Sequence, residues 1–309
     1  MFPLITLRLT FRALQDMSFP LYSGSALRGI FGKSLRRVSC LSKKSDCSGC
    51  AALLTCPYAS IFENGYIASK NGEERTNPYV IEPMPMGEKN IRQNDLFSFH
   101  HTLFGSAVEK MSYVLLAWAK TGNMGFTKER TQARLICVHQ VFPDGEERLL
   151  HDFENQDAET YEPLYDFSIP AEKETNTVNI CLRTPMRLQR DGHPISAEKL
   201  TAYDFLISVV RRQQILAKQH ILTYPAIDFN ELRPFIETAK IRDSALHWFD
   251  WFRYSSRQKT KIALGGIMGT FTLQGELTRL YPYLVMGKYF HVGKSAVLGM
   301  GKYTITDTF

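Results

Sequence analysis

The fold is decided by residues 3–14, PLITLRLTFRAL, and residues 21–38, LYSGSALRGIFGKSLRRV. The first segment is rich in branched and aromatic residues, which predicts a β-strand. In the second segment, apolar residues between Ala26 and Leu35 recur at the spacing of one helix face. Ser23 or Ser25 stands where a helix-capping residue is expected. A strand followed at once by an amphipathic helix indicates a fold of mixed α and β structure.

The same kind of pattern continues to residue 142. Further strands are predicted at residues 78–84, 95–105 and 133–142. An amphipathic helix is predicted at residues 106–122, with Ser106 near its start and Gly122 just past its end. The order β-α-β-β-α-β is that of a ferredoxin-like unit. We therefore predict that residues 1–142 form an N-terminal domain of this kind.

The pattern starts again in the second half of the chain. The predicted elements are a strand at residues 177–188, a long helix at 196–222 and glycine-punctuated strands at 263–277. A short helix that leads into a strand follows at residues 278–290, and a last strand at 301–305. A chain of 309 residues fits two domains. We predict an α+β protein with tandem ferredoxin-like (RRM-like) domains, the second over residues 176–309. Residues 143–175 are acidic and contain three prolines, so we expect a linker there.

Charge is unevenly distributed along the chain, although the net charge is only +6. Residues 28–50 carry six lysines and arginines against Asp46, and residues 251–309 carry eight against Glu276 and Asp307. Residues 143–175 carry eleven acids against two basic residues. Two basic blocks favour a polyanionic partner. Each block alone also fits a solvated face.

The N-terminal residues lack the basic region of a signal peptide and alternate like a strand. No uninterrupted apolar run reaches the ~18 residues of a membrane span. We therefore expect a cytoplasmic protein that does not use a membrane, in which disulfides are not expected.

Four cysteines lie within 17 residues, in the pattern C-x6-C-x2-C-x5-C. They are Cys40, Cys47, Cys50 and Cys56. A C-x2-C turn supplies two thiolate ligands from one bend, and the flanking cysteines can complete a tetrahedron, so we predict structural zinc. An iron–sulfur cluster, or no metal at all, remains the alternative. A closed four-sulfur set leaves no open position, so this metal-binding insertion over residues 40–56 is not expected to catalyse.

Close to the C-terminus lies GKYFHVGKSAVLGMGKYTI, residues 287–305, which holds four glycines and three lysines and no acid. A phosphate-binding P-loop would need four residues between its first glycine and the Gly-Lys-Ser, and here there are five. A dinucleotide fingerprint fails because Thr304 occupies the place of the third glycine. The stretch from Lys288 to Val292 reads as a strand instead.

These segments together resemble the Cas6 family of CRISPR-associated endoribonucleases, which belong to the RAMP superfamily. The resemblance rests on YSGSALRGIFGKSLRR, the four cysteines with CPYASIFE, TLFGSAVEK, WFRYSSRQKTKIALGGIMGTFTLQGEL and LVMGKYFHVGKSAVLGMGKY. It spans nearly the whole chain, and its most specific part is the glycine-rich loop 293–301. It implies two tandem ferredoxin-like domains and a protein that cuts precursor CRISPR RNA within each repeat, without a catalytic metal.

The resemblance gives the glycines and the basic residues a common purpose. Glycines let the backbone approach a phosphate closely, and lysines and arginines add charge. We expect one basic wall from the C-terminal half and another from the first helix. The predicted RNA-binding residues are Arg28, Arg36, Arg37, Arg253, Arg257, Lys259, Lys261, Gly293, Lys294, Ser295, Gly299, Gly301 and Lys302.

The implied chemistry is attack of the RNA 2′-hydroxyl on the adjacent phosphorus, which leaves a 2′,3′-cyclic phosphate and a 5′-hydroxyl. This reaction needs a general base, a cation and a general acid. Family members often use His, Tyr and Lys near the first helix, but residues 21–39 contain no histidine. The candidate catalytic residues are His291, His100, His101, Tyr22 and Lys33. A site built only from arginine and lysine remains open.

Two other functions fit the same sequence. One is a non-catalytic RAMP subunit that holds guide RNA in a CRISPR effector complex, which the missing helix histidine favours. The other is a zinc-ribbon RNA-binding or adaptor module unrelated to CRISPR. The expected partners are CRISPR repeat RNA and other Cas proteins.

Overall fold

The computed structural model describes residues 2–42, 47, 49–63, 76–122, 124–127, 129–221, 224–255 and 260–306. The chain divides into two compact units. Unit 1 comprises Met1–Phe167 and Lys218–Thr223, and unit 2 comprises Ser168–Ala217 and Tyr224–Phe309. Each unit contains helices and an antiparallel sheet, which confirms the predicted α+β class.

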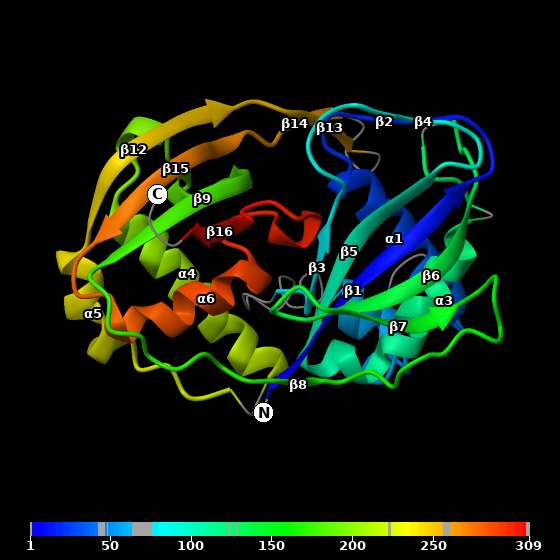
Figure 1. Ribbon diagram of the computed structural model, residues 1–309, viewed down its shortest axis with the longest axis horizontal. Coiled ribbons are helices and arrows are strands. Elements are labelled where there is room, and N and C mark those ends of the chain that lie inside the picture. The colour runs from blue at the N-terminus through cyan, green and yellow to red at the C-terminus, as the bar shows by residue number, and fades with distance from the viewer. Residues whose placement is uncertain are drawn as a thin grey trace. The chain divides into compact units, whose positions relative to one another are not determined.

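Unit 1 is built on a sheet with the strand order β3-β5-β1-β6-β7, in which neighbouring strands are antiparallel (Figure 1). The strands are β1 (Phe2–Ala13), β3 (Tyr79–Glu82), β5 (Leu96–Phe104), β6 (Ala133–Val141) and β7 (Glu147–Asp152). The short β8 (Asp166–Phe167) pairs with the start of β1, and β2 (Met17–Phe19) pairs with β4 (Lys89–Ile91). The helical elements are α1 (Gly24–Ser39), η1 (Ala59–Glu63), η2 (Gly105–Lys110) and α3 (Met111–Thr121).

The core of unit 1 lies between the sheet and helices α1 and α3. Phe31 of α1 stacks on Trp118 of α3 with ring centroids 5.1 Å apart, and both rings are fully buried. The Ser34 hydroxyl of α1 donates to the Ala117 carbonyl of α3 at 2.6 Å. Buried aromatic rings contribute a large apolar area, so this contact fixes α1 on the sheet.

Unit 2 is built on a four-stranded antiparallel sheet with the order β12-β15-β9-β16. The strands are β9 (Thr177–Met186), β12 (Lys240–Phe249), β15 (Gly266–Gln274) and β16 (Tyr303–Thr306). The helices are α4 (Ala202–His220), α5 (Phe229–Thr238) and α6 (Tyr281–Phe290), with short helical turns η3 (Ala197–Lys199), η4 (Thr278–Leu280) and η5 (Ala296–Leu298). Two hairpins extend the unit, β10 (Gln189–Arg190) with β11 (His193–Pro194) and β13 (Phe252–Ser255) with β14 (Thr260–Ala263).

The buried rings of Phe205, Phe271 and Tyr303 join α4 to the sheet of unit 2, with centroids 5.2 and 5.4 Å apart. The Tyr303 hydroxyl donates to the carbonyl of Leu284 at 2.6 Å, which ties the last strand to α6.

The order of elements is largely as the sequence predicts. In unit 1, β1, α1, β3, β5, α3 and β6 follow one another, and in unit 2 the corresponding order is β9, α4, β12, β15, α6 and β16. The spatial order of the four strands is also the same, β3-β5-β1-β6 in unit 1 and β12-β15-β9-β16 in unit 2. The structure adds β12 and α5, which the sequence analysis did not identify.

Two expectations were wrong. Residues 143–175 are not simply a linker, because β7 and β8 lie there and pair with β6 and β1. Unit 1 therefore extends to Phe167 rather than to residue 142. The expected strand from Lys288 to Val292 is instead the last turn of α6 as far as Phe290. The apolar residues of α6 pack against the core of unit 2. A short apolar run shows no period that would distinguish a buried helix from a buried strand, so the sequence pattern allowed either.

None of the helices in the described parts of the chain is long and apolar enough to cross a membrane.

Candidate functional site

The adjacent histidines of β5 point to opposite faces of the sheet, as strand alternation predicts. His101 is fully buried in the core, where Phe31 contacts its ring at a centroid distance of 4.8 Å. The indole N–H of Trp118 donates to its Nδ1 at 2.8 Å. Burial lowers the pKa of His101 to about 3, so the ring packs in its neutral form. This arrangement makes His101 a core residue.

The buried His101 predicts acid sensitivity of folding. Its pKa in the folded chain, about 3, lies below the ~6.5 of an unfolded chain. The unfolded state therefore binds the extra proton, and stability falls as the pH drops from about 6.5 towards 3. Between pH 6.5 and pH 5 the loss from this residue is about 2 kcal/mol. Urea unfolding at several pH values should show a shallower loss for His101→Gln than for a control at the exposed His151. Equal slopes would contradict this prediction.

His100 lies on the other face of the sheet, in a row of polar side chains. The strand register places it opposite Glu82 of β3 on one side and opposite Arg8 of β1 on the other. Arg8 is in turn opposite His139 of β6. Cross-strand partners share a face and lie close together. The row therefore brings two histidines to either side of one arginine.

Arg8 is held in this row by Glu147 of β7. Its Nε donates to both carboxylate oxygens of Glu147 at 2.9 Å, and its Nη1 donates to Thr10 Oγ1 at 3.0 Å. The hydrogen bond from Arg8 lowers the pKa of Glu147 below its usual range. The paired carboxylate offsets much of the guanidinium charge, so Arg8 is a weaker anchor for phosphate than an unpaired arginine.

Tyr22 belongs to the same part of unit 1. It is 4% exposed, and burial together with the negative charge of Glu82 raises the pKa of its phenol well above the ordinary value. Tyr22 is thus a neutral hydroxyl near Glu82, and Glu82 faces His100 across the strands. The structure brings these two candidate catalytic residues, Tyr22 and His100, to the same carboxylate.

The basic residues of α1 divide into two sets. The guanidinium of Arg28 lies 4.1 Å from the ring centre of Phe62, and that of Arg36 lies 5.4 Å from that of Tyr58. These two arginines hold the segment that follows the cysteines through cation–π contacts. Lys33 and Arg37 are exposed and lie one helical turn apart on the same face. The exposed pair is the part of α1 available to a polyanion.

The four cysteines are all described, half-buried and free of disulfides. Cys50 N–H donates to the Cys47 carbonyl at 3.3 Å, which forms the turn expected of C-x2-C. Burial and then the charge of Glu63 raise the pKa of the Cys47 thiol, Arg36 opposes them, and Cys56 and Cys40 contribute least. Arg36 hydrogen-bonds Cys40. Across the described part of the chain, no three histidine, cysteine or acidic side chains are assembled as a metal site.

The glycine-rich loop of unit 2 is a compact turn bonded to the end of β9. Lys294 N–H donates to the Arg187 carbonyl at 2.9 Å, and Gly301 N–H donates to that of Pro185 at 3.0 Å. Gly299 N–H donates to the Ala296 carbonyl at 2.8 Å. These three N–H groups are therefore used within the chain. A phosphate cannot bind these N–H groups while the loop keeps this conformation.

The side chains of this loop differ in exposure. Lys294 is exposed, while Ser295 and Lys302 are half-buried. His291 is 1% exposed, and its Nδ1 donates to the Met300 carbonyl at 3.1 Å. His291 directly follows α6, has a positive φ of 60°, and buries its ring in unit 2. Lys294 is thus the charged group that the loop offers to solvent.

Gly293 is half-buried in the same loop, and four further predicted RNA-binding residues fall within residues 253–261. Arg257 and Lys259 lie outside the described residues, and the backbone alone is described for Arg253 and Lys261. Their roles stay predictions.

The sequence analysis missed Arg8, Glu82, His139 and Glu147. Each is a polar residue within a strand, and the alternation of polar and apolar residues was the signal that could have placed Arg8 on the face of the sheet opposite the core. Which residues face it across the sheet depends on register, which no local pattern contains.

Comparison with known families finds two matches. The family model described as "CRISPR-associated endoribonuclease Cas6" matches residues 180–303. A second family model, AF_1859_N, described as "N-terminal domain", matches residues 2–162. The two matches cover most of unit 2 and nearly all of unit 1. A sequence search of the curated proteins found no match.

Solved structures of similar fold cover the whole chain. Thermus thermophilus Cas6 is 13% identical, with 99% of each chain covered and a TM-score of 0.59. A Cas6 product complex is 16% identical over 99% of this chain and 100% of that chain, with a TM-score of 0.59. A partial Cas6-RT-Cas1–Cas2 complex is 15% identical over 100% of this chain and 47% of that chain, with a TM-score of 0.58. At these identities the likeness concerns the fold.

Proposed function

Because the chain belongs to the Cas6 family of CRISPR-associated proteins, we propose that it processes precursor CRISPR RNA by cutting within each repeat. The observation that carries the proposal is the match of the Cas6 family model to residues 180–303, in a chain whose fold resembles Cas6 from end to end. We interpret both units as ferredoxin-like, because both sheets have the same strand order and the same placement of helices in sequence.

The proposed reaction is attack of the 2′-hydroxyl on the neighbouring phosphate, without a catalytic metal. It requires proton transfer from the attacking oxygen and to the leaving 5′-oxygen, and cations beside the phosphate. Histidine is suited to proton transfer near neutral pH. The products would be a 2′,3′-cyclic phosphate and a 5′-hydroxyl.

We assign proton transfer to His100 rather than to the other two candidate histidines. His101 is packed in the core, and His291 is buried with its Nδ1 bonded to the chain. His100 is half-buried on the face of the sheet opposite the one that carries His101, and it lies across the strands from Glu82 and Arg8. Tyr22 would support it as a neutral hydroxyl near Glu82. The sheet separates His100 from α1, so we assign Lys33 to phosphate binding.

We assign binding of the RNA backbone to the exposed basic residues. In unit 1 these are Lys33 and Arg37 on α1, and in unit 2 Lys294 is exposed on the glycine-rich loop. Contacts of this kind release counterions and weaken with added salt. Arg28 and Arg36 are expected to act through the cysteine segment that they hold.

The second candidate function is a non-catalytic RAMP subunit that holds guide RNA. It is supported by the absence of histidine from residues 21–39 and by the pairing of Arg8 with Glu147. Other Cas proteins are proposed as partners in either case, because a relative of this fold occurs in a Cas6-RT-Cas1–Cas2 complex.

Incubation of the purified chain with end-labelled repeat RNA in EDTA tests the proposal. We expect one cut per repeat, with a cyclic phosphate on the 5′ fragment. RNA bound tightly but left intact would support the non-catalytic subunit. Binding that ignores the repeat sequence would contradict both functions.

We also propose that Cys40, Cys47, Cys50 and Cys56 hold a structural zinc. The residues fit the group in type and spacing, and Cys47 lies within the electrostatic reach of Cys40 and Cys56. The four sulfurs would have to close around the ion, since no such group is assembled in the described residues. Zinc binding would then tie together the ends of the insertion.

Elemental analysis of the purified chain should give about one zinc per molecule, since four thiolates form one closed site. Cys50→Ser should lose the zinc and lower the melting temperature, while Cys181→Ser should change neither. If the analysis finds iron instead, and the protein absorbs visible light, the cysteines hold an iron–sulfur cluster rather than zinc. A chain free of both metals would overturn the proposal.

A further inference from the structure

Unit 1 exposes apolar side chains on α3 and on residues 161–165. Leu116 of α3 is 45% exposed, and Tyr161, Leu164 and Tyr165 are 46%, 49% and 37% exposed. A surface helix normally turns a polar face to water. Gathered apolar side chains on a surface mark a binding site more often than scattered ones do.

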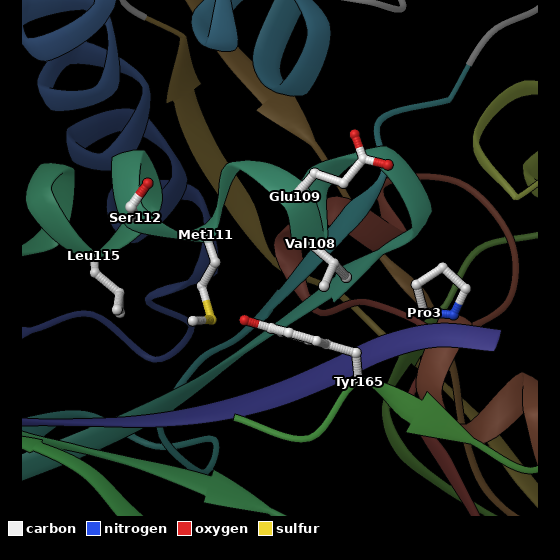
Figure 2. Close-up of a pocket in the computed structure, with 7 residues that line it drawn as sticks. All are labelled: Pro3, Val108, Glu109, Met111, Ser112, Leu115 and Tyr165. Atoms are coloured by element: carbon white, nitrogen blue, oxygen red, sulfur yellow. The ribbon is translucent and has the colours of Figure 1, made fainter. Parts of the chain in front are cut away.

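A pocket of about 400 Å³ joins the two segments. It is lined by Pro3, Val108, Glu109, Met111, Ser112, Leu115 and Tyr165. Figure 2 shows the ring of Tyr165 below Val108, with its hydroxyl directed towards Met111. Leu116 lies one helical turn after Ser112, so the exposed face of α3 continues from the pocket. The lining is mainly apolar, and the polar groups are Glu109, Ser112 and the phenol of Tyr165.

The segment that carries Leu164 and Tyr165 is held firmly by the rest of unit 1. The buried amide of Gln140 accepts from Leu164 N–H at 3.0 Å and donates to the Leu164 carbonyl at 2.6 Å. Leu4 N–H donates to the Tyr165 carbonyl at 3.3 Å, and Tyr161 N–H donates to that of Leu149 at 2.9 Å. The backbone is therefore satisfied while the apolar side chains face water. A surface fixed in advance loses little conformational entropy on binding.

The charge around this surface identifies the kind of occupant. Residues 149–172 contain seven acids and no lysine or arginine, although the guanidinium of Arg148 lies 6.0 Å from the ring centre of Tyr161. Glu109 lines the pocket. Burial raises the pKa of the Tyr165 phenol, and the nearby charge of Glu162 raises it further. Acids repel RNA and the anionic surface of a membrane. A second copy would bring its own acidic segment to the same place, since a two-fold interface uses the same patch on both copies.

We propose that this surface, defined by Val108, Met111, Leu115, Leu116, Leu164 and Tyr165 with its acidic border, binds a basic amphipathic segment of a partner protein. The apolar face of such a segment fills the pocket and covers Leu116 and Leu164. Its lysines or arginines lie against Glu159 and Glu162. This interaction is separate from RNA cutting and holds whether or not the chain is catalytic.

The test uses the full chain and two fluorescent 18-residue helical peptides. One carries leucine on one face and lysine on the other, and the second replaces each lysine by glutamate. Fluorescence anisotropy should show binding of the lysine peptide and at least tenfold weaker binding of the glutamate peptide. The doubly substituted Leu116→Ser/Leu164→Ser chain should bind the lysine peptide at least tenfold more weakly. These leucines are half exposed, so the variant is expected to fold.

Two further variants locate the binding. Leu96→Ser removes another exposed leucine of unit 1, 56% exposed, and should leave binding unchanged. Glu159→Gln/Glu162→Gln should weaken it about threefold to tenfold and reduce its salt dependence. Equal binding of both peptides, or unchanged binding by the double leucine variant, would overturn the proposal. So would self-association in sedimentation experiments that the leucine variant abolishes, because the occupant would then be a second copy.

Discussion

Replacing His100 with alanine is expected to slow cleavage of repeat RNA by at least ~100-fold under single-turnover conditions, because general acid–base catalysis contributes about 10²–10⁴-fold. His100 is the candidate histidine of unit 1 that is not sealed in the core, and it faces Glu82 and Arg8. The loss should appear in the rate of the chemical step. Affinity for the RNA should change less than twofold, since phosphate contacts supply most of the binding.

The control for this prediction is His193→Ala, which removes an exposed histidine from the β10–β11 hairpin of unit 2. It should cut RNA at the normal rate. The variant at His100 should also lose the part of the pH–rate profile that reports the histidine. A normal rate for His100→Ala, with a large loss for Lys33→Ala, would contradict the assignment and favour a site built from lysine and arginine.

Replacing Gly301 with alanine is expected to destabilise unit 2 by more than about 3 kcal/mol. The residue has a φ of +71°, which costs a side-chain-bearing residue ~1–2 kcal/mol. A Cβ there would also lie 1.8 Å from the Val292 carbonyl oxygen, a backbone atom that cannot move aside easily. The loop would have to shift, and its bond from Gly301 N–H to Pro185 would be strained or lost.

The matched control is Gly145→Ala, which has a φ of +89° but no atom within 4 Å of the added Cβ. It should cost only the conformational term of ~1–2 kcal/mol. Thermal unfolding should show a fall of roughly 6–12 °C for Gly301→Ala and a clearly smaller fall for Gly145→Ala. Equal shifts would mean that the close packing of the loop contributes nothing. RNA binding should fall with Gly301→Ala, because Lys294 belongs to the same loop.

Gly301 and His100 differ in how much of their role the sequence alone could predict. The pattern of glycines in residues 287–305 was visible, but its purpose was not. The structure shows that Gly301 is needed because another part of the backbone passes beside it. His100 was visible as one of two adjacent histidines in a strand, and alternation alone predicted that they would face opposite ways. The apolar residues Phe97, Phe99 and Leu103 alternate in register with His101, so the pattern also indicated which of the two enters the core, although that signal was not used.

The basic residues of α1 show the same limit. A helical pattern places Arg28, Lys33, Arg36 and Arg37 outside the apolar face, but it does not distinguish which of them are exposed. In the structure Arg28 and Arg36 lie over Phe62 and Tyr58, while Lys33 and Arg37 are exposed. The difference arises from a segment more than twenty residues further along the chain. A helix pattern contains no information about what packs on its polar side.

The sequence by itself determined the α+β class, the order of most helices and strands, the clustering of four cysteines and the resemblance to Cas6. These depend on residues close together in the chain, because periodicity and motif spacing are local properties. The tertiary structure alone decided that Glu82, His100, Arg8 and His139 form one row, and that residues 161–165 expose apolar side chains beside a pocket. Those outcomes depend on strand register and on packing between segments distant in sequence, where each side chain's surroundings come from other parts of the chain.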